Sequence, residues 1–278
     1  MSLSSAVVSN IAPELILQAA TILVTRRQSG VQGERLPPSF HQMNSAAGLA
    51  IQAAVSTQMG DHTGAWKCGI AADVRVDRVI LAPIYSKTIF SDPIAACPVW
   101  SRAGHVKIEP ELAFILGCDL PARDTPYEAA EVDAAIIRTH IALELIDSRY
   151  TNPDEVSFVE NLADGLLNQG LFLGPEVDGA KAKITTDMAI KVSSGLQQDK
   201  NLMPLIQFEG RHPNTHPRAP LYWLAEYLRS QGQGLQAGQA IITGSYAGSF
   251  EVALDQDICI QFGDLGELNV NFSRREIS

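Results

Sequence analysis

The run VKIEPELAFIL, residues 106–116, places two glutamates in a segment that is otherwise largely apolar. A short apolar run that contains branched and aromatic residues predicts a β-strand that is buried over most of its length. Side chains two residues apart on a strand point to the same face, so Glu109 and Glu111 are expected to stand side by side. Any fold of this chain must therefore accommodate two carboxylates close together in or near its core.

Two adjacent carboxylates raise each other's pKa unless a cation lies between them. Carboxylate oxygens are the ligands that Mg²⁺ prefers, and it usually keeps several of its waters. A third carboxylate, Glu144, lies in another apolar run, IALELI. These three glutamates could form a cation site, or they could occupy the solvent-facing positions of half-buried strands, because Glu-x-Glu is a common pattern. Asp147 and Arg149 follow this run. They could form a structural ion pair at least as readily as they could belong to a site.

The chain has 278 residues, 46% of them hydrophobic, and a formal net charge of −10. This length suits one large domain, or a main domain with a smaller one. The negative charge argues against a nucleic-acid partner, whose phosphates require a basic surface, and against an anionic membrane surface. None of the four cysteines forms a CxxC pair, and the basic pair Arg26 and Arg27 follows the N-terminal apolar stretch, the reverse of a signal peptide. We therefore expect reduced thiols and a cytoplasmic protein.

Helices are predicted for the first part of the chain. Apolar residues recur at helical spacing over residues 9–28, with Asn10 as the expected N-cap. An alanine-rich second helix follows a Gly/Pro loop, with Asn44 as its expected cap. We expect a helical region over residues 1–60 and a strand-rich domain over residues 61–278.

Short apolar runs bounded by Gly, Pro and Asp predict strands in the larger part. Within it, a helix is expected to begin at Pro126, with Thr125 as N-cap and Glu128 completing a capping box, and to be followed by a strand. Another helix is expected over residues 218–231, ended by Gly232. The fold class is therefore α+β, a strand-rich mixed β body with a smaller N-terminal helical region.

The blocks VKIEPELAFILGCDLP and ALELIDSRY resemble the 2-keto-4-pentenoate hydratase and 4-oxalocrotonate decarboxylase family of the fumarylacetoacetate hydrolase superfamily. The family pattern is an acid-x-acid strand ending in LGxDLP, a helix, and a glutamate shortly before DSR. RLPPSF, WKCGI, LADGLLNQGLFLG and LQAGQAIITGS match further family blocks in the right order. The resemblance spans residues 10–272 and implies the fumarylacetoacetate hydrolase type of body.

The resemblance also implies a site and an activity. One Mg²⁺ or Mn²⁺ would be held by Glu109, Glu111 and Glu144, with Lys67 at the substrate end of the pocket. The implied enzyme is a hydratase that adds water to a 2-hydroxy-2,4-dienoate, a small 2-oxo acid derivative from the catabolism of aromatic ring-cleavage products. It would be a homo-oligomer, and some members act in complex with a hydratase or decarboxylase partner.

Several positions depart from the family pattern. Ala71 and Ala72 stand where hydroxyl residues are usual, and Lys87 occupies or neighbours an acidic position that is a candidate general base. A lysine could be that base only with a depressed pKa. Asn168 and Gln169 stand in a block that loses a serine, and they could offer amide hydrogen bonds to the substrate instead.

The glycine-rich stretch ITGSYAGS leaves two interpretations. Ser245 and backbone amides could line the pocket, or the stretch could be a tight turn between strands. Together with the departures, three functions stay open: a hydratase with a changed substrate, a related decarboxylase that releases CO₂, or a non-catalytic partner subunit that keeps the fold.

Overall fold

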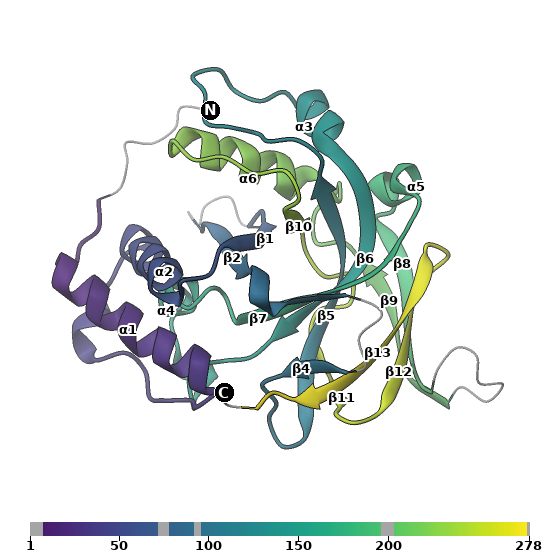
Figure 1. Ribbon diagram of the computed structural model, residues 1–278, viewed down its shortest axis with the longest axis horizontal. Helices are drawn as coiled ribbons and strands as arrows, with labels where there is room; N and C mark the ends of the chain where they lie inside the picture. The colour runs from purple at the N-terminus through teal and green to yellow at the C-terminus, as the bar shows by residue number, and fades with distance from the viewer. Residues whose placement is uncertain (1–7, 72–77, 92–95, 196–202, 277–278) are drawn as a thin grey trace.

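The structure, a computed structural model, describes residues 8–71, 78–91, 96–195 and 203–276. Two β-sheets of eight and five strands form the body, and helices surround it (Figure 1). The helices are α1 (Pro13–Ser29), α2 (Ser45–Met59), α3 (Ala129–Ala135), α4 (Phe158–Ala163), α5 (Gly179–Ile184) and α6 (Ala219–Ser230), with 3-10 turns η1 (Pro38–Phe40), η2 (Ser86–Thr88) and η3 (Pro153–Glu155). The strands are β1 (Thr63–Gly69), β2 (Ile80–Tyr85), β3 (Ile89–Ser91), β4 (Cys97–Val99), β5 (His105–Leu116), β6 (Ile136–Ile146), β7 (Asn168–Glu176), β8 (Asp187–Ser194), β9 (Met203–Arg211), β10 (Ala240–Ile242), β11 (Phe250–Ala253), β12 (Asp257–Phe262) and β13 (Gly266–Arg274). The expected α+β class with a strand-rich body is confirmed.

Strand β5, the apolar run that contains the paired glutamates, lies at the centre of the larger sheet, whose order is β2-β1-β10-β5-β6-β7-β3. It pairs with β6 along nearly its whole length. On its other side β10 covers residues 113–115 and β11 covers residues 105–108, which leaves a gap between them. Pro110 lies in this gap, where its carbonyl accepts a hydrogen bond from the N–H of Tyr246. A proline is tolerated in this central strand because no ladder partner there requires its missing N–H.

The larger sheet curls back on itself. Its two end strands, β2 and β3, are joined directly by the single turn η2, so the ends of the sheet must lie close together. Glycines permit this approach: a Cβ on Gly64 would lie 2.7 Å from Ile89 Cδ1, and one on Gly170 would lie 2.5 Å from the Thr88 carbonyl oxygen. The inner face carries mostly small and branched side chains, namely Ala65, Ile84, Ala113, Ile115, Ala142, Leu171, Ala240 and Ile242.

The smaller sheet, of order β4-β13-β12-β8-β9, packs on the outer face of β5 and β6. Their shared core includes Leu112 and Phe114 of β5 and the inward side chains of β8, β12 and β13. Helix α6 adds Leu221, Leu224 and Leu228 to the same core. The outer face of β5 is thus apolar and fully covered, which leaves the glutamates on the inner face of the curled sheet.

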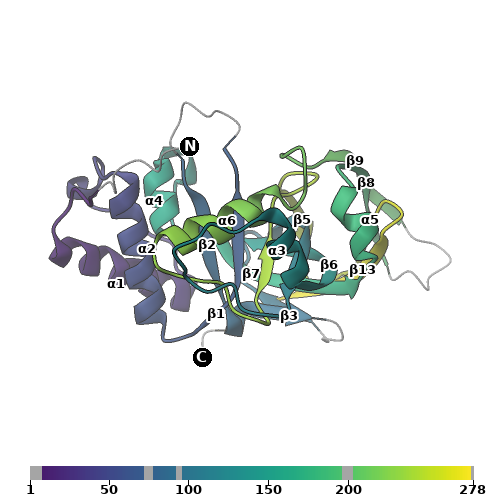
Figure 2. The ribbon, with the colours of Figure 1, turned by 90° about the horizontal axis from the view of Figure 1, so that it is seen from above.

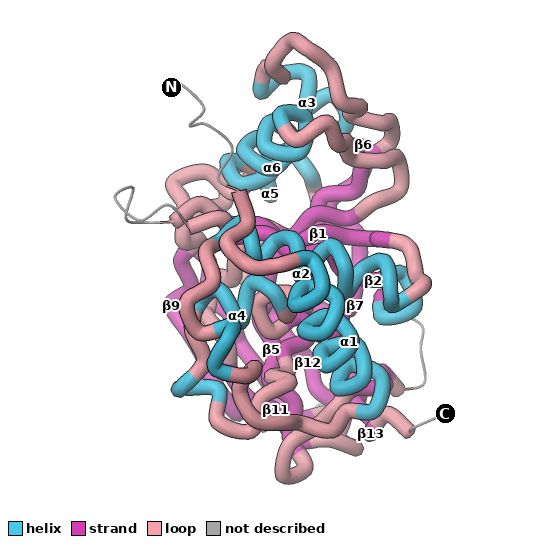
Figure 3. The backbone as a smooth tube through the Cα atoms, turned by 90° about the vertical axis from the view of Figure 1, so that its left-hand side faces the viewer, coloured by secondary structure: helices cyan, strands magenta, loops and turns pink. Residues whose placement is uncertain are grey.

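The N-terminal helices form a separate layer with a core of their own. Figures 2 and 3 show α1, α2 and α4 gathered at one end of the molecule, and α2 packs between the other two. Their cluster also takes in Tyr150 and Ala163 from the later chain. The division of the chain at residue 60 stays a prediction. No helix in the described parts of the chain is long and apolar enough to cross a membrane.

The predicted caps of the first two helices fare differently. Asn44 accepts a hydrogen bond from the N–H of Ala47 at 2.9 Å, so its predicted capping role is confirmed. The prediction for Asn10 is wrong, because α1 begins at Pro13 after Ala12. The Asn10 side chain instead accepts a hydrogen bond from the N–H of Asn44, a contact between distant residues that local spacing does not reveal.

The predicted start of the third helix is also wrong. Its N-cap is Glu128 and not Thr125, because the Glu131 carboxylate accepts a hydrogen bond from the Glu128 N–H and closes the capping box there. Helix α3 ends at Ala135, and β6 begins directly with Ile136. The helix predicted over residues 218–231 is present as α6, and Gly232 follows it with a φ of 70°.

Replacing Gly170 by alanine tests the closure of the curled sheet. The added methyl group would meet the Thr88 carbonyl oxygen at 2.5 Å and force β3 away from β7. We expect Gly170→Ala to lower the free energy of unfolding by about 1–3 kcal/mol, measured by urea denaturation.

Gly179→Ala is the matched control. The nearest atom to its added methyl group is Thr139 Oγ1 at 3.3 Å, and alanine is favoured over glycine in a helix such as α5. Equal denaturation midpoints for the two variants would contradict the proposed role of Gly170 in the closure.

Candidate metal centre

The three glutamates meet on the inner face of the curled sheet. Glu109 of β5 lies directly opposite Glu144 of β6 in the ladder, and Glu111 follows two residues along on the same face. One carboxylate oxygen from each lies within 4.8 Å of the other two. Glu111 is 2% exposed, Glu144 is fully buried, and Glu109 is half-buried. Three carboxylates are thus concentrated at one point of an apolar sheet.

Burial and mutual repulsion perturb the carboxyl groups. Burial, followed by the negative charge of Glu144, raises the pKa of Glu109 to about 7. Burial and the charges of Glu144 and Glu109 raise the pKa of Glu111 well above its usual range, although the N–H of Gly244 opposes this shift. Full ionisation of the cluster therefore requires additional positive charge.

Lys67 of β1 supplies one positive charge. Its Nζ lies 2.7 Å from Glu144 Oε1 and donates a hydrogen bond to the Leu166 carbonyl at 3.1 Å. Burial disfavours the ammonium, but the charges of Glu144 and Glu109 outweigh burial and raise the pKa of Lys67 above its ordinary value. Lys67 is therefore protonated at neutral pH.

The donor set fits a hard divalent cation. Three carboxylates opposed by one ammonium leave a net charge of −2 when all are ionised. Glu144 Oε1 is bound by Lys67 and by the Asn168 amide at 2.8 Å, whereas Glu144 Oε2 is buried with no hydrogen-bond partner among the described residues. An unpartnered buried oxygen within an all-oxygen ligand set suits Mg²⁺ or Mn²⁺.

The loop between β10 and β11 holds Glu111 and the backbone of Pro110. The Gly244 N–H donates to Glu111 Oε2 at 2.6 Å, and the Ser245 hydroxyl lies 3.2 Å from the Pro110 carbonyl oxygen. Gly244 has a φ of 128°, and a Cβ there would lie 2.6 Å from Pro213, so only glycine brings this N–H to the carboxylate. The structure thus places Ser245 as a brace between its own loop and the acid-x-acid strand.

Asn168 and Gln169 point to different surroundings because they are adjacent on strand β7. Asn168 donates to Glu144 Oε1, so it orients a carboxylate of the cluster. The Gln169 amide instead bonds the backbone N–H and carbonyl of Trp100 and the Ile146 carbonyl. The structure brings Asn168 to the site and gives Gln169 backbone partners outside it.

Lys87 and Ala71, two departures from the family pattern, lie in the described parts of the chain. Lys87 is exposed on η2, where its backbone N–H donates to Asp61, and within the described ranges no hydrogen bond or ion pair joins its ammonium to the three carboxylates. Ala71 is half-buried just after β1. Ala72 lies outside the described residues.

The predicted ion pair between Asp147 and Arg149 is not formed. Asp147 pairs with Arg102 at 2.7 Å, and Arg149 pairs with Asp164 at 2.6 Å. The two residues follow the end of β6, and each side chain reaches a partner from a distant part of the chain. Their closeness in sequence was therefore a poor guide to pairing.

Two features close to the site were missed by the sequence reasoning. Residues 164–168 form a tight connection, here called the left-handed turn, in which Gly165, Leu166 and Leu167 have φ values of 76°, 51° and 67°. Arg27 of α1 contacts this turn. The sequence gives a weak indication that Arg27 is buried, because it lies four residues after the buried Leu23 and therefore on the same face of the helix. A positive φ at leucine has no comparable sequence signal.

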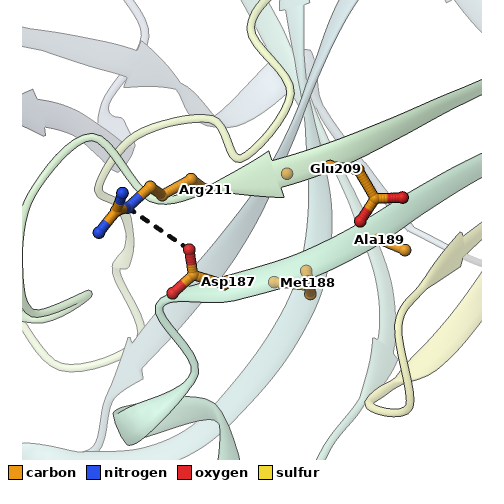
Figure 4. A pocket seen from close by; sticks show the side chains of 6 residues that line it. Asp187, Met188, Ala189, Glu209 and Arg211 are labelled. Carbon is orange, nitrogen blue, oxygen red and sulfur yellow. Dashed lines mark ion pairs between the residues drawn. The ribbon is translucent and has the colours of Figure 1, made fainter.

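A surface hollow of about 350 Å³ lies elsewhere, at the ends of β8 and β9 (Figure 4). Asp187 and Arg211 approach each other there at 3.4 Å, and both side chains are largely exposed. None of the three glutamates lines this hollow. It is therefore separate from the carboxylate cluster.

Comparisons with known proteins identify hydratases and a decarboxylase as relatives of this chain. The chain is 25% identical to 2-keto-4-pentenoate hydratase of Paraburkholderia xenovorans over 268 residues, 93% of this chain and 92% of the relative. It is 30% identical to 4-oxalocrotonate decarboxylase of a Pseudomonas species over 175 residues, 59% of this chain and 60% of the relative. No protein-family model matches the chain.

Among solved structures, 4-oxalocrotonate decarboxylase from Pseudomonas putida, complexed with magnesium and adipate, has the same fold. The TM-score is 0.74 at 20% identity, over 95% of this chain and 99% of that chain. The similarity therefore extends over nearly the whole chain in both sequence and fold, and it confirms the resemblance to the 2-keto-4-pentenoate hydratase and 4-oxalocrotonate decarboxylase family.

Proposed function

We propose that this protein is a metal-dependent enzyme that interconverts the enol and keto forms of a small 2-oxo acid, and that it acts as a hydratase on a 2-hydroxy-2,4-dienoate. The observation that carries the proposal is the convergence of Glu109, Glu111 and Glu144 with Lys67. The names of the hydratase relatives support the reaction class.

The three glutamates would hold one Mg²⁺ or Mn²⁺. When bound, a divalent cation supplies Lewis acidity that stabilises negative charge on the 2-oxygen of such an acid. Gly244 and Asn168 keep Glu111 and Glu144 in place, so this ligand set is organised before any substrate arrives.

Lys67 fits the role of an orienting cation and proton donor. An ammonium has three N–H donors, and here two of them face Glu144 and the Leu166 carbonyl. The remaining donor can bind the substrate carboxylate or give a proton to a substrate atom. Because the pKa of Lys67 is raised, the group is a cation at neutral pH, which suits the binding of a substrate carboxylate and argues against a general-base role.

The hydration itself balances in two steps. The dienol loses its hydroxyl proton and gains one at the terminal carbon, which produces a conjugated 2-oxo-3-enoate. Water then adds its hydroxyl group to the carbon two along from the carbonyl carbon and its other proton to the carbon between them. In both steps negative charge develops at the 2-oxygen, and preorganised positive charge is most effective at that atom.

Decarboxylation of a 2-oxo acid is the second candidate. It uses the same charge at the 2-oxygen, and it is supported by the 30% identity to a 4-oxalocrotonate decarboxylase. A cytoplasmic location, a homo-oligomer and a hydratase or decarboxylase partner all stay predictions.

Hydrogen exchange at C3 of 2-oxopentanoate in D₂O, followed by NMR, tests the step that both candidates share. We expect exchange that depends on Mg²⁺ or Mn²⁺. Glu111→Gln should lose bound metal and exchange together, because it removes a negative charge and a ligand from the cluster.

Glu251→Gln is the matched control for this experiment. Glu251 is an exposed residue on β11, the strand next to β5, and it is not part of the cluster. It should retain both metal and exchange. Unchanged metal content in a folded Glu111→Gln protein would rule out the assigned ligands, and bound metal without exchange in the wild type would favour a non-catalytic partner subunit.

Metal affinity is expected to rise with pH between 6 and 8. The pKa of Glu109 is raised to about 7 in the metal-free protein, so its carboxyl group is mostly protonated at pH 6 and mostly ionised at pH 8. A cation must displace that proton at the lower pH, which weakens apparent binding by about tenfold per pH unit for each proton displaced. Calorimetric Mn²⁺ titrations in buffers of different ionisation enthalpy would count the released protons. An affinity that does not vary over this range would contradict the coupling.

A further inference from the structure

We propose that Arg27 of the N-terminal helix α1 is a positioning residue for the metal centre. It holds the left-handed turn, residues 164–168, in the conformation that places the Leu166 carbonyl against Lys67 and the Asn168 amide against Glu144. The inference rests on the proposed function, because it concerns the residues proposed to bind the cation.

The left-handed turn has an unusual backbone. Three successive residues, Gly165, Leu166 and Leu167, adopt positive φ values, and two of them carry side chains that disfavour this region. Such a conformation persists only when surrounding contacts fix it. The question is therefore which contacts span the turn.

Arg27 spans the turn from end to end. Its Nη2 donates to the Asp164 carbonyl at one end, and its Nη1 donates to the Asn168 carbonyl at the other end at 3.1 Å. Its Nε also lies 3.3 Å from the Asp164 carboxylate, and the side chain is only 9% exposed. A planar guanidinium makes such paired contacts, whereas the point charge of a lysine cannot.

The turn closes directly around this guanidinium. A Cβ on Gly165 would lie 2.7 Å from Arg27 Nη2, so the guanidinium lies directly against the backbone of the turn. The other buried arginine nearby, Arg149, binds the carboxylate and carbonyl of Asp164. Among the described side chains, Arg27 is the one that hydrogen-bonds the backbone at both ends.

The left-handed turn also positions the groups that contact one carboxylate oxygen, Glu144 Oε1. Leu166 accepts from Lys67 Nζ at 3.1 Å, and Asn168 donates to Glu144 Oε1 at 2.8 Å. Lys67 Nζ contacts the same Glu144 oxygen. A shift of the turn would therefore move both groups that orient Glu144, the carboxylate opposite Glu109 in the ladder.

The experiment compares Arg27→Gln and Arg27→Lys with the control Arg35→Gln. Arg35 links the same N-terminal segment to Glu160 of α4, but it does not contact the turn. Two properties are measured at a temperature below the thermal unfolding midpoint of every variant. The first is Mn²⁺ affinity, with the EPR spectrum of the bound ion, and the second is amide hydrogen exchange of a peptide covering residues 164–170.

We expect Arg27→Gln to weaken Mn²⁺ binding by about 10- to 100-fold, the usual effect of losing a group that orients a metal ligand, and to speed exchange in the turn. Arg27→Lys should show the same direction of change, since it keeps the positive charge but loses the paired N–H donors of the guanidinium. It also tests the proposal if Arg27→Gln does not fold. Arg35→Gln should match the wild type in both readouts.

Wild-type Mn²⁺ affinity and unchanged exchange in a folded Arg27 variant would overturn the proposal. So would equal losses in the Arg27 and Arg35 variants, which would indicate general destabilisation. A wild-type protein that binds no Mn²⁺ would overturn the proposed function and, with it, the metal-positioning role. The exchange data would then show separately whether Arg27 holds the turn.

Discussion

The contact between Lys67 and Glu144 is the interaction on which the interior of this protein depends. Glu144 is fully buried, and burying an ionised carboxylate is costly unless a positive charge and hydrogen bonds accompany it. The ammonium lies 2.7 Å from Glu144 Oε1, while Oε2 has no hydrogen-bond partner among the described residues. One positive charge against three carboxylates cannot neutralise the cluster. When all three carboxylates are ionised, the remaining charge of −2 equals that of a divalent cation in magnitude. Without such a cation, the raised pKa values of Glu109 and Glu111 favour their protonated forms.

Strand register determines whether this cluster forms at all. Glu109 and Glu144 face each other because β5 and β6 pair in one particular register, and a slip by one residue would send Glu144 to the opposite, apolar face. Two neighbouring parts of the fold limit where these strands can lie. Helix α3 ends at Ala135, directly before β6, and the loop after β10 is hydrogen-bonded to the Pro110 carbonyl between the two glutamates of β5.

The parts of this structure that could be predicted from sequence are those that local physics determines. The alternation of side chains along a strand places Glu109 beside Glu111, and Asn44 caps its helix through a neighbour three residues on. Asn10, Thr125 and the supposed Asp147–Arg149 pair were misjudged because their partners come from elsewhere in the chain or from a competing local cap. Lys67 was placed by family resemblance and not by spacing. Gln169 could not be distinguished from Asn168 without knowing which face of β7 each occupies.

The left-handed turn shows why the helical layer and the β body cannot be independent. Two leucines at positive φ cost about 1–3 kcal/mol each, yet the turn lets α4 reverse into β7 within a few residues, so that the first residue of the strand faces Glu144. A right-handed path would continue the helix and carry Asn168 away. The opposing contacts come from three regions of the chain: the Asn161 carbonyl within the segment, the Asp147 N–H after β6, and Arg27 from α1. Contacts from separate parts of the fold therefore oppose the strain, and α1, which contributes no residue to the carboxylate cluster, still helps to determine where the carboxylates point.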